Sequence, residues 1–317
     1  MLALGAIIAA AGGNASADGG TPRYGTRMES VGIGLLAGVL FGLLTVLVRR
    51  GVMRVPDPIA GSVVVLAMAA GFVLLATLVL GHGGDLLNAR TGVLYLAIGV
   101  FAPGMSQIIF MVAIRDAGAS RVAIMIGMAP LLSTMIAIVF RGEPFKAGLA
   151  AGTVLIVLGG ISLAWDRNLP PGFRRRGMLL GFVCAMLFAV RDNLVRMTDA
   201  SSDMDPTAGT TWTLVGAFLA VALFALATKR SALPAQMRLC IRPYLPAGVV
   251  FAMAYFTLVL ALEIGRVTIF APLNAMQSMW TVLFAWLLLG KSDGIGFRIV
   301  AAMLLVVSGG ILIGVFR

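Results

Sequence analysis

The sequence predicts an all-α polytopic membrane protein, with ten transmembrane helices arranged as two inverted five-helix repeats. Composition is the first observation, since 60% of the 317 residues are hydrophobic and only 12% are charged. Soluble chains carry roughly 25% charged residues. The second observation is a series of ten apolar segments, each about as long as a helix that crosses hydrocarbon. The third is an internal duplication that divides these segments into two halves.

The apolar segments are separated by short connections that hold most of the Arg, Lys, Pro and Asp residues. The longest connections, Asp166 to Gly177 and Lys229 to Pro246, leave no room for a soluble domain between crossings. The segments cover approximately residues 31–50, 58–80, 92–113, 119–140, 147–165, 177–197, 207–228, 246–263, 267–289 and 296–316.

Short motifs recur in order along the chain at a separation of 147–150 residues. Asp57 to Ser62, DPIAGS, returns as Asp205 to Thr210, DPTAGT. Asp caps a helix start and Pro fits its first turn, so this motif marks where a segment begins. The other recurring pairs are Leu47-Val48-Arg49 with Leu194-Val195-Arg196, Gly142 with Gly290, and Gly159-Gly160-Ile161 with Gly309-Gly310-Ile311. Because five crossings is an odd number, the second half must be inverted, as in transporters that alternate access around a central site.

The duplication divides the chain into four parts. Residues 1–29 form a leader that we expect to be disordered or, if Met28 is the true start, not translated. Residues 30–165 form the first five-helix repeat, residues 166–176 a basic linker, and residues 177–317 the second repeat.

Small residues recur every four positions in the first segment of each repeat. Such spacing lets helices approach closely in lipid, so we interpret these positions as packing faces. They are Gly34, Gly38 and Gly42 in one repeat and Gly177, Gly181, Ala185 and Ala189 in the other.

One motif in each half carries a resemblance to a known family. The first half has Ala119-Ser120, then Pro130, then Arg141-Gly142-Glu143, and the second has Ala261-Leu262, then Leu287-Leu288-Leu289-Gly290-Lys291. With the duplication, this pattern resembles the EamA-type, ten-helix branch of the drug/metabolite transporter superfamily over about residues 30–316. The second half departs from the family pattern, because Ser278 replaces the mid-helix Pro and Lys291 replaces the Glu.

The resemblance implies a secondary transporter in the cell inner membrane, with a central cavity lined by both halves. It also implies a small-molecule substrate, such as an amino acid, another metabolite or a drug, with export as the expected direction. Two alternatives stay open: an integral-membrane enzyme that acts on lipid-type substrates, and a non-transporting membrane partner protein. The oligomeric state is also left open.

Three consecutive polar residues, Arg191, Asp192 and Asn193, interrupt the sixth apolar segment. Arg191 lies about 20 Å along a span of roughly 30 Å, a depth at which ionisable residues usually face protein or a water-filled cavity. Arg191 could hold a carboxylate or phosphate, and Asp192 an amine or a coupled proton. The alternative is mutual neutralisation, since Asp192 and Arg196 form an i, i+4 pair. The counterpart of the triplet in the first half, Leu44 to Val46, is nearly apolar, so the triplet is specific to one repeat.

Further polar or aromatic side chains in apolar segments complete the predicted substrate site. Asn274, Gln277 and Ser278 share one helix face, which we expect to meet protein or cavity rather than lipid. Interhelical hydrogen bonding is the competing interpretation for the amides, and packing is the competing interpretation for Trp280. The additional candidates are Gln107, Tyr255, Asn274, Gln277 and Trp280.

Several other functions are disfavoured by the residues. Gly290-Lys291-Ser292 resembles the end of a phosphate-binding loop, but the required preceding glycine is Ala285. A single histidine, His82, and two isolated cysteines, Cys184 and Cys240, argue against zinc chemistry. We therefore expect no cofactor and no metal. The net charge of +11 falls between apolar runs, so we expect no nucleic-acid partner.

The basic residues are distributed unevenly between the two sides of the predicted membrane. Of the 24 Lys and Arg residues, 8 fall on the side of the N-terminus, 15 on the opposite side, and Arg191 lies within the span. The positive-inside rule therefore places both termini outside the cytoplasm. The resembled family implies the reverse orientation, and both possibilities stay open. Arg115 and Asp116 end the third segment, where we expect a solvated position.

Overall fold

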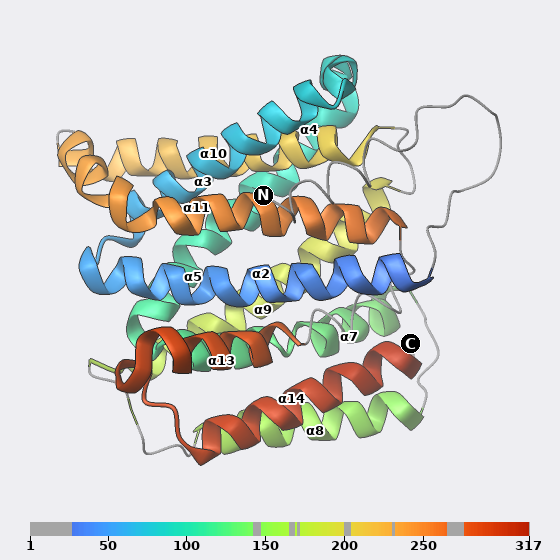
Figure 1. Ribbon diagram of the computed structural model, residues 1–317. Coiled ribbons are helices and arrows are strands. Elements are labelled where there is room, and N and C mark those ends of the chain that lie inside the picture. Colours follow the sequence, from blue (N-terminus) through green and yellow to red (C-terminus); the bar gives the residue numbers. More distant parts are fainter. Residues whose placement is uncertain are drawn as a thin grey trace.

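A computed structural model describes residues 27–141, 147–164, 169, 172–199, 204–229, 232–264 and 276–316 of the chain. Within these ranges every regular element is a helix (Figure 1). The predicted leader therefore lies outside the described residues, except that Arg27 to Glu29 already belong to the first helix. Five of the eleven residues of the predicted linker also lie outside them, and its last two residues open a helix.

The first half of the chain contains helices of very different lengths. They are α2 (Arg27–Arg54), α3 (Pro58–Val79), η1 (His82–Leu87), α4 (Ala89–Gly99), η2 (Val100–Met105), α5 (Ser106–Ala117), α6 (Ala119–Ile126), α7 (Ala129–Arg141) and α8 (Ala147–Ala164).

The second half repeats the pattern of long helices followed by shorter ones. Its described elements are α9 (Arg175–Asp199), α10 (Pro206–Lys229), α11 (Leu233–Ile264), α13 (Gln277–Leu289), η4 (Gly290–Asp293) and α14 (Phe297–Phe316).

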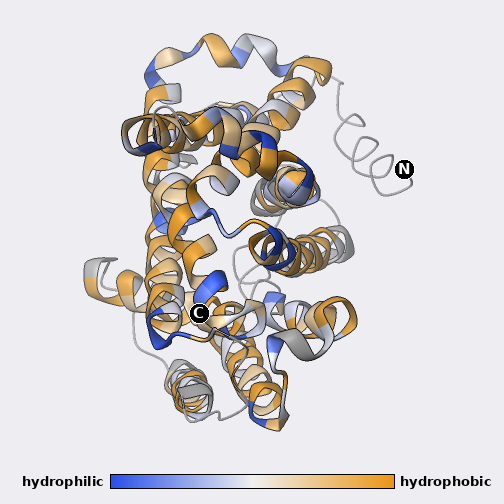
Figure 2. Cartoon of the chain, turned by 90° about the vertical axis from the view of Figure 1, so that its left-hand side faces the viewer, coloured by the Kyte–Doolittle hydropathy of each residue, from blue (hydrophilic) through white to orange (hydrophobic). Residues whose placement is uncertain are grey.

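Six helical stretches in the described chain are long and apolar enough to cross a membrane. They are Gly32–Arg54, Pro58–Val79, Ala89–Ala117, Arg175–Val195, Pro206–Lys229 and Leu233–Leu258. Four shorter apolar helices accompany them: Ala119–Ser133, Ala150–Ser162, Gln277–Leu289 and Phe297–Ile313. Hydrophobic residues fill most of the length of the helices, and many hydrophilic residues lie near helix ends (Figure 2). Large apolar side chains such as Leu75 and Leu223 are exposed, as lipid contact requires.

Two predicted spans differ in detail from the sequence expectation. The third is a continuous segment in the sequence, but its helix is interrupted at Ala102, which has extended dihedrals and precedes a cis peptide bond to Pro103. Proline removes a backbone donor and disfavours the α conformation in the preceding residue, which explains the break. In the eighth span, α11 begins at Leu233, inside the connection that we expected to run to Pro246, and it contains both Pro243 and Pro246.

The packing of helices follows the duplication. The first helix of the first repeat, α2, packs on α11, and its counterpart in the second repeat, α9, packs on α5. Two pairs of counterparts pack on each other: α8 on α14, along one edge of the bundle, and α3 on α10 (Figure 1). The internal repeat in the sequence is therefore also a repeat in the contacts between helices.

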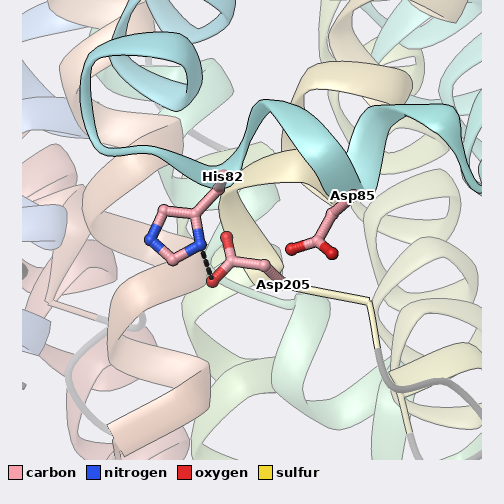
Figure 3. Close-up of side chains that lie close together, drawn as sticks. All are labelled: His82, Asp85 and Asp205. Atoms are coloured by element: carbon pink, nitrogen blue, oxygen red, sulfur yellow. Dashed lines mark ion pairs between the residues drawn. The ribbon is translucent and has the colours of Figure 1, made fainter. Parts of the chain in front are cut away.

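The counterpart helices α3 and α10 run antiparallel, because the start of each lies beside the end of the other. Asp57 caps α3 and pairs with Lys229, the last residue of α10. Asp205 accepts a hydrogen bond from the backbone of Thr207 at the start of α10, and its carboxylate lies 3.0 Å from Nδ1 of His82, just after α3 (Figure 3). The recurring Asp-Pro motif thus does more than begin a helix, since each Asp also joins the two repeats.

The small residues at four-residue spacing lie in close helix contacts, which confirms their interpretation as packing faces. A Cβ on Gly42 would lie 2.7 Å from Cβ of Trp280, and one on Gly177 would lie 2.7 Å from the backbone nitrogen of Ala117. Ala185 and Ala189 are fully buried.

Candidate functional site

A cavity lies between the two repeats and is lined by side chains from both. The residues from the first repeat are Phe41, Leu44, Thr45, Pro103, Gln107, Phe110, Ile126 and Ala129, and those from the second are Phe188, Arg191, Phe251, Leu258 and Gln277. Three of the predicted substrate-contacting residues, Arg191, Gln107 and Gln277, therefore meet in one cavity.

Arg191 lies on α9 and is held by its neighbour in the sequence. Its Nε and Nη2 donate to Oδ1 of Asp192 at 2.9 and 2.7 Å. Its guanidinium carbon also lies over two rings, 4.9 Å from the centroid of Phe188 and 5.7 Å from that of Tyr255. The cation is thus paired with a carboxylate and fixed in orientation, and a fixed orientation is what a recognition group requires. Arg196, the alternative partner of Asp192, has a side chain outside the described part of the structure.

The predicted triplet does not act as one unit. Arg191 lines the cavity, whereas Asp192 and Asn193 are not among the described residues that line it. Asn193 is buried, and its Nδ2 donates to Oγ of Ser133 at 3.1 Å and to the carbonyl oxygen of Ala189 at 2.8 Å. This contact between α9 and α7 is the interhelical hydrogen bonding that competes with a substrate role for Asn193.

Two cavity glutamines come from different repeats. Gln107 lies at the start of α5, just after the break at Pro103, so the interruption of the third span positions it. Its side chain is 4% exposed, and within the described chain its Nε2 has no hydrogen-bond partner. Gln277 begins α13 and is 8% exposed. Gln107 therefore has a buried donor in the cavity wall without an acceptor among the described residues.

The remaining predicted residues have different environments. Tyr255 contacts Arg191 but does not appear in the cavity wall, and its ring packs edge-to-face on that of Phe251 at 5.7 Å. Trp280 stacks on Phe284 at 6.2 Å and lies against Gly42. Asn274 lies outside the described residues. The environment of Trp280 therefore favours a packing role, which is the alternative to stacking on a substrate.

The apolar counterpart of the triplet also lies at this cavity. Leu44 and Thr45 of α2 line it together with Arg191 of α9, so equivalent positions of the two repeats face one space. The hydroxyl of Thr45 donates to the carbonyl oxygen of Phe41 within its own helix. Arg191 is therefore the charged residue that distinguishes the part of the cavity wall from the second repeat from the part from the first.

Sequence reasoning missed a buried carboxylate away from the cavity. Asp293, which is fully buried, accepts hydrogen bonds from the backbone nitrogens of Ala119 and Ser120 at 2.8 and 2.9 Å and from the hydroxyl of Ser120. The fully buried Arg121 donates to the carbonyl oxygen of Asp293 at 3.0 Å. Asp293 thereby caps α6 and ties the second repeat to the first. Its position in a short connection gave no signal of burial.

The expectation that Arg115 and Asp116 are solvated is wrong for Asp116. This carboxylate is buried and accepts from Nε of Arg115 at 3.0 Å and from Nε of Arg176 at 2.5 Å. Arg176 lies in the first turn of α9, so the pair again joins the repeats. A buried carboxylate is stable only when it is paired in this way.

The structure also forms a cluster that the sequence did not suggest. The ligand-type atoms of His82, Asp85 and Asp205 lie within 4.8 Å of one another, and these residues come from η1 and from the start of α10 (Figure 3). Asp205 already accepts from Thr207 and pairs with His82. We therefore interpret the His82–Asp205 pair as a link between the repeats.

Comparison with known proteins agrees with the repeat architecture. The EamA-like transporter family matches the chain twice, over residues 29–165 and 175–315. No curated protein matches the chain. Among solved structures, one titled only "Crystal structure of protein" has a similar fold, with a TM-score of 0.62 and 18% identity over 90% of this chain and 96% of its own. Since the family matches nearly the whole length in two copies, this multi-pass membrane protein belongs to the EamA-like transporter family.

Proposed function

We propose that the protein is a secondary transporter that moves small organic solutes across the inner membrane. The observation that carries this proposal is the cavity between the two repeats, because a site shared by two pseudo-symmetric halves can be opened to either side by rocking them. Ten crossings, arranged as inverted repeats, complete the proposed architecture, with the shorter apolar helices spanning the membrane beside the six long ones.

Arg191, Gln107 and Gln277 are the residues that we propose to contact the solute. Each is buried, polar and part of the cavity wall. Asp192 acts on the solute through Arg191, and Tyr255 supports the guanidinium from the side of its ring. Export of metabolites is the proposed direction, which rests on the family alone.

Transport by purified protein in proteoliposomes tests the proposal. A panel of labelled small solutes should include at least one that the wild-type protein moves across the bilayer and that Arg191→Ala moves at least about tenfold more slowly. A charge-assisted hydrogen bond contributes about 1.5–3 kcal/mol, which corresponds to this loss.

The matched control is Arg90→Ala, because Arg90 is exposed at the start of α4 and is not among the residues that line the cavity. We expect it to transport at the wild-type rate. The proposal fails if the wild-type protein moves no member of the panel, or if both variants lose transport equally. A product formed from an added lipid would favour the enzyme alternative instead.

A further inference from the structure

We infer that the cavity is built for a monocarboxylate with an apolar body, and that Arg191 and Gln107 hold its carboxylate. The inference rests on the proposed function, because it names the class of solute for the same cavity. This solute differs from the one that the sequence suggests. The adjacent charges of Arg191 and Asp192 favour a zwitterion, such as an amino acid. Three observations carry the inference: unused donors, the position of Asp192, and the apolar remainder of the wall.

The first observation is a hydrogen-bond donor without an acceptor. Nε2 of Gln107 is buried in the cavity wall, and no described residue accepts a hydrogen bond from it. A buried donor of this kind is costly unless something accepts from it. A carboxylate oxygen of the solute satisfies this requirement, and an ammonium group cannot.

Arg191 supplies further donors, and the positive charge, in the same cavity wall. A guanidinium has five N–H donors, and the contacts with Asp192 use two of them. Tyr255 is a further hydrogen-bond partner, so donors remain after both contacts are counted. The rings of Phe188 and Tyr255 fix the plane of the guanidinium, which directs the remaining donors.

The cavity offers no comparable partner for a cation. None of the described residues in its wall is Asp or Glu. Asp192 is the nearest carboxylate in the sequence, but it is absent from the wall, and its Oδ1 already accepts both N–H groups of Arg191. Asp192 is therefore a positioning residue for Arg191, and the ammonium group of a zwitterion would be desolvated without a carboxylate partner.

Apart from Thr45 and Gln277, the rest of the wall is apolar, and four of its residues are phenylalanines. Phe41, Phe110 and Phe251 line it with Leu44 and Leu258. Such a surface binds a hydrocarbon body by removing apolar area from water. A carboxylate that meets Arg191 and Gln107 and an apolar body that meets these side chains therefore match the composition of the wall.

Three probes with the same branched carbon chain test the inference in the wild-type protein in lipid nanodiscs. They are 4-methylpentanoate, leucine and 3-methylbutylamine, which are an anion, a zwitterion and a cation. Binding measured by calorimetry should be at least about tenfold tighter for 4-methylpentanoate than for either of the others, the factor expected for one unpaired buried group. Equal or tighter binding of leucine or of the amine overturns the inference.

Variants of Gln107 test its role directly. Gln107→Leu should weaken binding of 4-methylpentanoate by about fivefold or more, and Gln107→Glu by more, since it places a like charge beside the probe. Gln236→Leu is the matched control, because Gln236 lies near the start of α11 and is not in the cavity wall, and it should bind like wild type. Wild-type affinity in both Gln107 variants contradicts the assigned contact.

The inferred solute class and the proposed transport function can be disproved independently of each other. If none of the three probes binds, the inferred solute class is wrong. The proposed transport function still stands in that case if the proteoliposome panel contains a solute whose movement depends on Arg191.

Discussion

At the scale of single residues, the most informative feature is the use of charge inside the bundle. Arg191 and Asp192 are adjacent in the sequence, yet only Arg191 belongs to the described wall of the cavity. Asp192 neutralises it, so the ion pair can be kept in an apolar environment. The side chain that can recognise a solute and the side chain that holds it in place are thus distinct.

A coupled proton gives the first prediction. Asp192 is the carboxylate bonded to the cavity arginine, and it is the proposed carrier of a coupled proton. Asp192→Asn should therefore abolish the pH dependence of transport, measured as initial rates in proteoliposomes across a pH series. A pH dependence identical to that of wild type would rule out this role for Asp192.

The buried carboxylate of Asp293 gives the second prediction. Asp293→Ala leaves two backbone N–H groups and the Ser120 hydroxyl without their acceptor, and each buried orphan costs about 1–3 kcal/mol. We expect a loss of about 2–5 kcal/mol in stability, measured as thermal unfolding in detergent. Asp85→Ala, at a partly exposed turn, is the control and should change stability by less than about 0.5 kcal/mol. Equal stability of the two variants would contradict the capping role.

At the scale of helices, close approach of backbones decides which elements pack. α4 crosses α10 where Gly99 lies against the carbonyl oxygen of Thr213 and Gly216 lies against that of Leu96. Likewise, Gly152 of α8 and Gly309 of α14 face each other's carbonyl oxygens. Without a hydrophobic driving force between helices in lipid, such contacts supply much of the association energy.

The third prediction concerns the crossing of α4 with α10. A Cβ on Gly99 would overlap the carbonyl oxygen of Thr213, which is backbone and cannot rotate away. Gly99→Ala should therefore destabilise the protein by about 3 kcal/mol or more, or prevent its folding. Gly71→Ala is the matched control, because nothing lies within 4 Å of the added atom, and it should be neutral or stabilising. Expression level and thermal unfolding in detergent measure both variants.

At the scale of the whole molecule, carboxylates join the two repeats at both ends of the bundle. At one end Asp57 pairs with Lys229, Asp116 with Arg176, and Asp293 caps α6. At the other end His82 pairs with Asp205. The pairs Asp57–Lys229 and Asp205–His82 occupy equivalent positions of the antiparallel helices α3 and α10. This is the relation that an inverted duplication produces.

The fourth prediction concerns orientation. The end that carries most of the basic residues should face the cytoplasm under the positive-inside rule, which places the C-terminus outside. A reporter fused after Arg317 that is active only in the cytoplasm should then be inactive, and a reporter active only outside should be active. The opposite pair of results would instead support the orientation that the family resemblance implies.

The sequence by itself determined the membrane class, the family and the duplication, because these depend on composition and on spacing along the chain. It also identified Arg191, Gln107 and Gln277 as polar exceptions in apolar spans, since such residues are costly in lipid wherever they face. It did not separate Arg191 from Asp192 and Asn193. Three consecutive helical residues point in different directions, and the neighbouring helices decide which of these directions faces the cavity.

The tertiary structure decided which polar groups have partners. Asp116 and Asp293 are typical of solvated connections in the sequence, but residues about 60 and 174 positions away bury and pair them. His82 and Asp205 meet in the same way across the two repeats. Pairing between residues so far apart in the sequence arises when the repeats pack together. It leaves no pattern in the sequence around either residue. The physical reason is that hydrophobicity is a property of each segment, whereas the partner of a buried charge is a property of the assembled fold.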